Sequence, residues 1–413
     1  MTERGDPPGG SCRFCAAPLD ESVADLGMQP LSNAFIGPAH AERMEPFYPL
    51  HAHVCGTCRL VQLAQFESPG HIFSDYVYFS SYSESWLRHA EAYAAAMLPR
   101  LGPAAQVVEI ASNDGYLLQY FQRAGVRVLG VEPAANVAAV AAGRGICTEA
   151  AFFGQATATR LKAQGWSPDL LVANNVLAHV PDLNDFAAGL KRLLAPAGLL
   201  TIEFPHLLRL LEDTQFDTIY HEHFSYFSLT VAERVLAHHG LAVVDVEELP
   251  THGGSLRLHV RHAGSGPAAP AVGALRTRED AAGLPGAAIY RRFAERVVQI
   301  KCELLTFLIA ARRAGQRVAG YGAPAKGNTL LNYCGIGPEL LAFTVDRSPH
   351  KQGLKLPGSR IPVLAPEALL AARPDYVLIL PWNLREEVMA QMAGIREWGG
   401  RFVVPVPELR VMA

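Results

Sequence analysis

The sequence predicts an α/β protein with an N-terminal metal-binding module, a central doubly wound domain and a C-terminal Rossmann-like α/β domain. Three observations lead to this prediction. Two Cys-x2-Cys pairs lie near the N-terminus, one series of alternating strands and helices begins at Gln106, and a second begins at Arg317. Strands that alternate with helices at this spacing are typical of mostly parallel sheets. We place the three parts at residues 1–72, 73–262 and 275–413.

The composition is that of a globular protein with more than one hydrophobic core. The chain has 413 residues, of which 50% are hydrophobic, and this is enough for two or three domains. The 36 basic and 39 acidic residues give a net charge of −3, so no overall positive field attracts nucleic acid or an anionic membrane. No apolar run reaches the roughly 18 residues of a membrane helix, and the first residues lack the apolar core of a signal peptide. We therefore expect a cytosolic protein that binds neither nucleic acid nor membrane.

Four of the seven cysteines form two pairs with the spacing of metal ligands. "CRFC" contains Cys12 and Cys15, and "CGTC" contains Cys55 and Cys58. Cytosolic thiols stay reduced, and two such pairs offer four thiolates to a tetrahedral zinc ion. Because four thiolates leave no open position, we predict a structural zinc site. The alternative is that the two pairs occur by chance, and the long spacer between them weakens the pattern.

A segment rich in tyrosine and serine separates the cysteine pairs from the central domain. It contains Tyr76, Tyr78 and Tyr82 and continues as a predicted helix from about Ser83. The rings either pack as ordinary surface or line a pocket, and the segment alone favours neither.

The central domain is predicted from a regular alternation of apolar runs and amphipathic stretches. "QVVEIASND" predicts a buried strand, "GYLLQYFQRAG" a helix that ends at Gly125, and "VRVLGVEP" a second strand. Three further helices are predicted over "AANVAAVAAGRG", "QATATRLKAQG" and "DLNDFAAGLKRLLAPAG", and strands near Ile146, in "DLLVANNVL" and in "LLTIEFP". "LAVVDVEELPTHGGSLRLHVRH" predicts two more strands that join around Gly253 and Gly254. A ligand is expected at the carboxyl ends of the parallel strands.

The C-terminal third repeats this alternation with a different sequence. A linker, "AGSGPAAPAVG", precedes a long predicted helix, "AAIYRRFAERVVQIKCELLTFLIAARRAG". Four strands are then predicted in "RVAGYG", "LLAFTVD", "DYVLILP" and "RFVVPVP", with helices between them.

The turn after the first strand of the central domain indicates the cofactor. In "EIASNDG", Ala111, Asn113 and Gly115 take the places of the glycines of a dinucleotide-binding turn. Side chains there would crowd a pyrophosphate, whereas S-adenosylmethionine contains no phosphate and tolerates them. The turn therefore favours S-adenosylmethionine over NAD.

Other polar residues at the carboxyl ends of the strands are the expected cofactor contacts. Glu132 ends the second strand, where an acid accepts hydrogen bonds from both ribose hydroxyls; the alternative is a solvated loop residue. The asparagines of "NNVLAHV" are either cofactor contacts or turn formers. The full set of expected cofactor contacts is Glu109, Ala111, Asn113, Asp114, Gly115, Glu132, Asn174, Asn175 and Val176.

Seven short motifs, spread over nearly the whole chain, carry a resemblance to a known family. They are "CRFC…CGTC", "DYVYFSSYS", "EIASNDGYLL", "NNVLAHV", "YHEHFSYFS", "HGGSLR" and "YGAPAKGNTLLNY". In this order the set resembles the deoxysugar C-methyltransferases of antibiotic biosynthesis. The resemblance implies a zinc module, a central S-adenosylmethionine domain and a C-terminal Rossmann-like domain that act together. It also implies methylation of C-3, next to the ketone of a nucleoside-diphosphate 4-keto-6-deoxysugar, with dTDP as the expected nucleotide.

Carbon methylation of this kind needs a base that removes the proton next to the ketone, and donors that stabilise the enolate. By resemblance, His223 is the base, since an imidazole titrates near neutrality. His179 is a second candidate acid or base; the alternative is a satisfied core histidine. His221 and His223 stand at i, i+2 without an i+4 partner, so we do not expect a metal site here.

The resemblance implies orienting roles for further side chains. Glu222 and Tyr220 would orient the substrate or share the proton relay, Tyr76 would reach in from the tyrosine-rich segment, and Tyr78 would contact the substrate. In "YGAPAKGNTLLN", Lys326, Gly327 and Asn328 lie at a strand-to-helix turn, and a helix N-terminus with a lysine is typical of an anion site. The Ser or Thr that follows the lysine of a Walker loop is missing. A sugar-nucleotide diphosphate is therefore the expected ligand rather than hydrolysable ATP.

Three other functions are consistent with parts of the sequence. O- or N-methylation on another natural-product intermediate needs no base acting on carbon, so loss of His223 would then be milder. A non-enzymatic interaction protein with a zinc module would not bind S-adenosylmethionine. An NAD-dependent dehydrogenase is disfavoured by "ASNDG". We expect a monomer.

Overall fold

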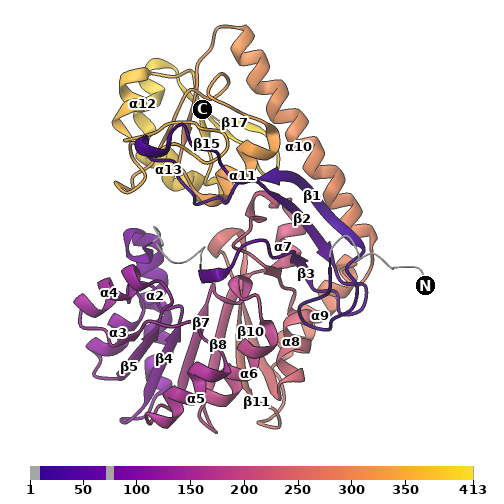
Figure 1. Ribbon diagram of the computed structural model, residues 1–413, viewed down its shortest axis with the longest axis vertical. Helices are drawn as coiled ribbons and strands as arrows, with labels where there is room; N and C mark the ends of the chain where they lie inside the picture. The colour runs from indigo at the N-terminus through magenta and orange to yellow at the C-terminus, as the bar shows by residue number, and fades with distance from the viewer. Residues whose placement is uncertain (1–9, 71–78, 413) are drawn as a thin grey trace. The chain divides into compact units, whose positions relative to one another are not determined.

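The computed structural model describes residues 10–70 and 79–412, which form two compact units (Figure 1). Each unit is assembled from segments that are not adjacent in the sequence. The first unit comprises Met1–Asp20, Val54–Leu207 and Glu222–Pro285, and the second comprises Glu21–His53, Leu208–His221 and Gly286–Ala413.

The first unit is built on a seven-stranded sheet with the order β10-β11-β8-β7-β4-β5-β6. The strands are β4 (Gln106–Ile110), β5 (Arg127–Val131), β6 (Thr148–Glu149), β7 (Leu170–Asn174), β8 (Leu199–Pro205), β10 (Leu241–Leu249) and β11 (Ser255–His262). The strands from β4 to β8 run parallel, whereas β10 and β11 are antiparallel. Every residue of β7 is buried, as expected for a parallel strand covered on both faces. The predicted doubly wound sheet and its antiparallel hairpin are confirmed.

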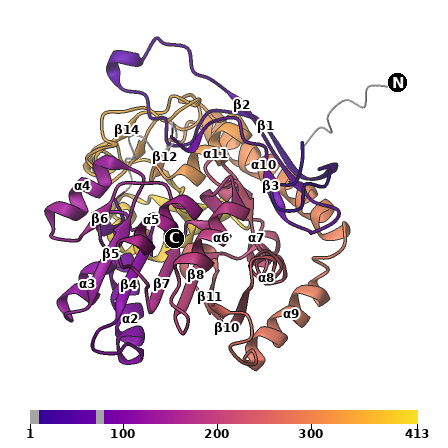
Figure 2. The same ribbon diagram turned by 60° about the horizontal axis from the view of Figure 1, so that its bottom comes forward.

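Helices cover both faces of this sheet (Figure 2). On one face pack α5 (Gln155–Ala163), α6 (Leu183–Leu193) and α8 (Leu229–His238). On the other pack α2 (Glu84–Met97), α3 (Leu118–Arg123) and α4 (Ala135–Gly143). Three of these helices begin at a side-chain cap, in which Ser83, Asp182 and Ser228 accept a hydrogen bond from the backbone N–H three residues later.

A short strand pair in the first unit joins the second cysteine pair to the "YHEHFSYFS" segment. Strand β3 (Val61–Leu63) is antiparallel to β9 (Ser225–Tyr226), with Val61 opposite Tyr226. The backbone N–H of Leu63 also donates to the carbonyl of Phe224 at 3.0 Å. The segment after Glu222 is therefore held by residues that directly follow Cys58.

The second unit contains a six-stranded sheet with the order β14-β13-β12-β15-β16-β17. Its strands are β12 (Val318–Tyr321), β13 (Thr344–Val345), β14 (Val363–Leu364), β15 (Tyr376–Ile379), β16 (Arg401–Val404) and β17 (Arg410–Met412). All pairs are parallel except β16 with β17. Helix α10 (Ala288–Arg313) is the long helix predicted from the sequence, and α11 (Ala325–Cys334) follows β12. The predicted Rossmann-like alternation is confirmed, with β14 and β17 as additional strands.

Residues between the two cysteine pairs belong to the second unit. Strand β1 (Glu21–Gln29) packs against α10, and Ile36 pairs with Lys355. The Arg360 guanidinium binds the carboxylate of Glu45 at 2.8 Å. The compact units are discontinuous in the sequence. The domain boundaries predicted from the sequence remain predictions.

No helix within residues 10–70 and 79–412 combines the length and apolar character needed to cross a bilayer.

Candidate active site and metal centre

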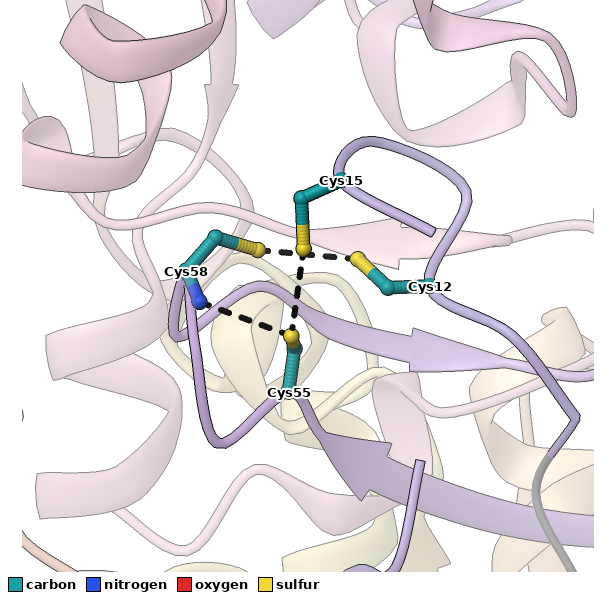
Figure 3. Close-up of side chains that lie close together, drawn as sticks. All are labelled: Cys12, Cys15, Cys55 and Cys58. Carbon is teal, nitrogen blue, oxygen red and sulfur yellow. Dashed lines mark hydrogen bonds between the residues drawn. The ribbon is translucent and has the colours of Figure 1, made fainter. Parts of the chain in front are cut away.

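The four cysteines of the two pairs converge on one point in the first unit (Figure 3). The Sγ atoms of Cys12 and Cys58 lie 3.5 Å apart, as do those of Cys15 and Cys55, and all four lie within 4.8 Å of one another. Tetrahedral zinc with Zn–S bonds of about 2.3 Å requires sulfur separations of about 3.8 Å. The donor set therefore fits zinc and leaves no position for a substrate.

Each cysteine pair is shaped by a tight turn. The backbone N–H of Ala16 donates to the Cys12 carbonyl at 2.8 Å, and that of Arg59 to the Cys55 carbonyl at 2.9 Å. Ala16 and Arg59 have positive φ angles of 60° and 65°. The Gln62 amide donates to the Cys12 Sγ at 3.2 Å, which stabilises the thiolate form.

The expected cofactor contacts of the first turn lie together at the carboxyl ends of β4 and β5. The Glu132 carboxylate accepts hydrogen bonds from the backbone N–H groups of Asn113 and Ala134, both at 2.9 Å. Ala111, Asn113 and Gly115 have φ angles of 56°, 49° and 78°, so the chain forms a left-handed turn without three glycines. Because two N–H groups hold Glu132, it is a fixed part of this turn and not a solvated loop residue.

Acidic side chains gather around this turn. Burial raises the pKa of Glu109 well above its ordinary value, and burial also raises the pKa of Glu132. Asp114 is fully buried and paired with Arg144 at 3.1 Å through Oδ2. Its Oδ1 has no hydrogen-bond partner within residues 10–70 and 79–412. A cofactor with amine and hydroxyl donors, such as S-adenosylmethionine, fits this arrangement of acceptors.

Asn174 ends β7 and Asn175 follows it, and both were expected to contact the cofactor. Strand β7 is the parallel neighbour of β4. The carboxyl end of β7, with Asn174, Asn175 and Val176, therefore lies at the same edge of the sheet as the turn after β4. The Asn175 N–H donates to the Glu203 carbonyl at 2.7 Å, and its φ is 52°. The Oδ1 atoms of Asn174 and Asn175 are buried without a partner among the described residues. These asparagines thus shape the turn and still present acceptors.

Two predicted catalytic histidines lie against each other in the first unit. The rings of His179 and His223 are 4.7 Å apart and nearly perpendicular, at 74°. The Phe224 N–H donates to the Ala178 carbonyl at 2.7 Å, which joins the two segments next to the histidines. Burial lowers the pKa of His179 to about 4, with the Glu222 backbone acting in the opposite direction. His179 is therefore a neutral imidazole at physiological pH.

Tyr226 is a neighbour of this pair that the sequence analysis did not select. Its ring lies 6.1 Å from that of His223. It belongs to the quoted motif, but only the ring contact in the structure shows that it lies beside His223. Among the other expected catalytic residues, Glu222 is buried in the first unit, and Tyr220 is the second-to-last residue of the Leu208–His221 segment of the second unit. Tyr76 and Tyr78 lie outside the described residues.

The expected anion-binding residues lie at the N-terminus of α11 in the second unit. The Lys326 ammonium donates to the Asn383 side chain at 2.7 Å and lies 4.4 Å from the centre of the Trp382 ring. The Trp382 indole donates to the Asp217 Oδ2 at 2.7 Å. Burial raises the pKa of Asp217 to about 6, while Lys326 acts to lower it. Burial lowers the pKa of Lys326.

Gly327 and Asn328 occupy the same turn but have different surroundings. A Cβ atom on Gly327 would lie 2.8 Å from the Cβ of Leu380, the residue after β15, so close packing of α11 against Leu380 accounts for this glycine. Asn328 is 1% exposed, and its Nδ2 has no partner among the described residues. Lys326 and Asn328 were predicted from the sequence, whereas Asp217 and Trp382 were not, because neither is adjacent to them in the chain.

Comparisons with known proteins cover nearly the whole chain. Residues 12–73 match a family model for a zinc binding domain, residues 85–246 a methyltransferase domain, and residues 250–407 a C-methyltransferase C-terminal domain. The chain is 37% identical over 409 residues to the C-methyltransferase NovU of Streptomyces niveus, covering 98% of this chain and 97% of that protein.

Two solved structures resemble part of the chain. Magnesium protoporphyrin IX methyltransferase from Synechocystis PCC 6803 with bound SAH is 14% identical, with a TM-score of 0.35, and the match covers 43% of this chain and 83% of that one. The PH0226 protein from Pyrococcus horikoshii OT3 is 14% identical, with a TM-score of 0.36, and the match covers 48% of this chain and 99% of that one.

Proposed function

This chain belongs to the C-methyltransferase family, and from that premise we propose that it methylates a carbon next to the ketone of a nucleoside-diphosphate 4-keto-6-deoxysugar. We assign the acceptor as C-3 and the nucleotide as dTDP. Bound S-adenosylmethionine supplies the electrophilic methyl group. The zinc ion has a structural role, and we place the enzyme, as a monomer, in the cytosolic biosynthesis of an antibiotic sugar.

The pairing of His179 with His223 is the observation that most supports carbon methylation. O- or N-methylation acts on an atom that already has a lone pair, whereas a carbon next to a ketone must first lose a proton. We assign that proton transfer to His223. The neighbouring His179 is neutral because of its burial, so it does not repel the imidazolium that His223 forms on accepting the proton.

The remaining side chains orient the reactants. Tyr220, Glu222 and Tyr76 are assigned to substrate orientation and to stabilisation of the enolate oxygen. Glu132 accepts hydrogen bonds from the ribose hydroxyls of the cofactor. The acceptor oxygens of Asp114 and Asn174 bind the amine and adenine ends of the cofactor. We assign the substrate's diphosphate to Lys326 and Asn328, and an anion there would replace the contact between Lys326 and Asn383.

The test follows the α-proton and the methyl group separately. The protein is incubated in deuterium oxide with S-adenosylmethionine and dTDP-4-keto-6-deoxysugars, and mass spectrometry measures solvent deuterium at the α-carbon and carbon-bound methyl. His223→Ala should abolish both, while the matched control His40→Ala, at an exposed position, should keep both. Lys326→Gln should raise KM for the sugar by about tenfold or more, without changing S-adenosylmethionine affinity.

Methyl transfer to oxygen or nitrogen, with no deuterium uptake, would replace this proposal by the heteroatom alternative. A His223→Ala variant as active as the native enzyme would remove His223 as the base.

A further inference from the structure

We propose that Arg13 is a positioning residue that holds the segments of His179 and His223 against the zinc-binding cysteines. The inference rests on the proposed function, since it takes these two histidines as the catalytic pair. Arg13 lies between Cys12 and Cys15 in the sequence, and its guanidinium donates to the backbone carbonyls of Pro181 and Leu63 in the first unit.

The Arg13 side chain contacts three segments that are distant in sequence. Nη1 donates to the Pro181 carbonyl at 3.0 Å, and Nη2 donates to the Leu63 carbonyl. The guanidinium carbon lies 5.4 Å from the centre of the Phe224 ring. The Arg13 backbone N–H is itself fixed by the Gln62 side chain at 2.9 Å.

These contacts fall directly beside the two histidines. Pro181 follows His179 by two residues, and Phe224 is the residue after His223. Phe224 is also the residue whose N–H donates to Ala178 and whose carbonyl accepts from Leu63. The planar guanidinium therefore links the backbone at Pro181 and Leu63 to the Phe224 ring, next to the two imidazoles that lie 4.7 Å apart.

The cysteine cluster is what makes Arg13 rigid. Coordination of both flanking cysteines fixes the main chain on either side of Arg13, so the guanidinium is presented with little loss of side-chain freedom. A lysine at this position would offer one point charge and could not donate along two fixed directions. The metal centre thus has a role in the chemistry, through the geometry of the histidine pair, as well as in stability.

Arg234 provides a matched control within the same unit. Its Nη1 donates to the Cys58 carbonyl at 3.2 Å, so it also ties a cysteine pair to the rest of the unit. It does so from α8, which contains none of the proposed catalytic residues. Removal of Arg234 should therefore affect stability without altering the histidine pair.

The experiment compares Arg13→Gln, Arg13→Lys and Arg234→Gln in the full-length protein. Zinc content, S-adenosylmethionine affinity and the imidazole resonances of 13C-labelled histidine are measured for each, with His179→Asn and His223→Asn to assign the signals. For both Arg13 variants we expect retained zinc, unchanged cofactor affinity, shifted resonances of His179 and His223, and α-deuterium exchange slowed on the order of tenfold to a hundredfold in kcat. For Arg234→Gln the resonances and exchange rate should match the native protein.

Three outcomes decide the inference. Native resonances in an Arg13 variant that retains zinc, or the same shifts in Arg234→Gln, would overturn it. If the Arg13 variants fail to fold or lose zinc, Phe224→Leu removes the ring contact without touching the cysteine pair; the histidine resonances should then shift, and unchanged signals would refute the inference. If the native enzyme methylates no 4-keto sugar while the Arg13 variants shift both histidines, the proposed function fails and the positioning role stands.

Discussion

Burial of the His179 imidazole determines which protonation state the folded protein holds. In the folded protein the pKa of His179 is lowered to about 4. The imidazole therefore stays unprotonated over a pH range in which the same residue of the unfolded chain, with a pKa of about 6.5, binds a proton. The unfolded state thus binds more protons between about pH 6.5 and pH 4. Stability from this residue is complete above pH 6.5 and is lost as the pH falls toward 4.

His179→Asn should therefore reduce the acid sensitivity of folding. Between pH 7.5 and pH 5, His179 lowers the free energy of unfolding by up to about 2 kcal/mol, because about 1.4 kcal/mol accompanies each unit of pKa difference. Urea unfolding at the two pH values measures this difference. His40→Asn, at an exposed position, should leave the pH dependence unchanged, and an equal pH dependence in His179→Asn and native protein would contradict the assignment.

At the scale of elements, a buried carboxylate on α9 (Pro270–Ala282) holds the first residues of α8. Glu279 is 1% exposed and accepts hydrogen bonds from the N–H groups of Leu229 and Thr230, at 2.6 and 3.0 Å, which begin α8. It also binds the His206 ring at 2.8 Å. One side chain thereby caps α8 and fixes the turn after β8.

Glu279→Gln should destabilise the protein by about 2 to 3 kcal/mol, because the amide places a donor against groups that themselves donate. The measurement is the free energy of unfolding in urea. Glu233→Gln is the matched control, since its partner Arg276 is 49% exposed, and should cost about 1 kcal/mol or less. Equal losses in both variants would show that Glu279 contributes no more than a surface ion pair.

Elements differ in how well the sequence predicted them. Strands β4, β5, β7 and β8 were predicted because each is an apolar run buried on both faces. Strands β9 and β14 contain two residues each, too few for any hydrophobic period to be detected. Their pairing depends on partners elsewhere in the chain, since β9 pairs with β3 and β14 with β13.

At the scale of the whole molecule, the cysteine cluster could be predicted because the two cysteines of each pair are only three residues apart in the sequence. The cofactor turn was also predictable, because all its residues follow strands of one parallel sheet. The environment of Lys326 was not, since Asp217 and Trp382 reach it through tertiary contacts alone. The membership of residues 21–53 in the second unit likewise depends on packing of β1 against α10.

Zinc removal should act on the first unit, because all four ligands belong to it. Chelation, or Cys55→Ser, should lower the stability of the first unit on the order of 5 kcal/mol, since the free energy of metal binding is part of the folding free energy. Calorimetry with and without chelator, together with metal analysis, measures this loss. Cys302→Ser, an exposed thiol of the second unit, should change neither; an unaltered melting profile after complete zinc loss would contradict a structural role.

The discontinuous units also constrain the order in which the protein can fold as it leaves the ribosome. Strand β1 is synthesised early, but its partner α10 begins only at Ala288. The face of β1 that packs against α10 therefore stays uncovered until most of the chain has emerged, although the neighbouring strand β2 (Tyr48–Val54) is synthesised soon after β1. A chaperone that binds apolar segments would find its target on that face. For the same reason, cutting the gene after Pro285 would yield the first unit together with orphaned pieces of the second, whereas splicing out residues 21–53 and 208–221 with short linkers is the rational route to a separate first unit.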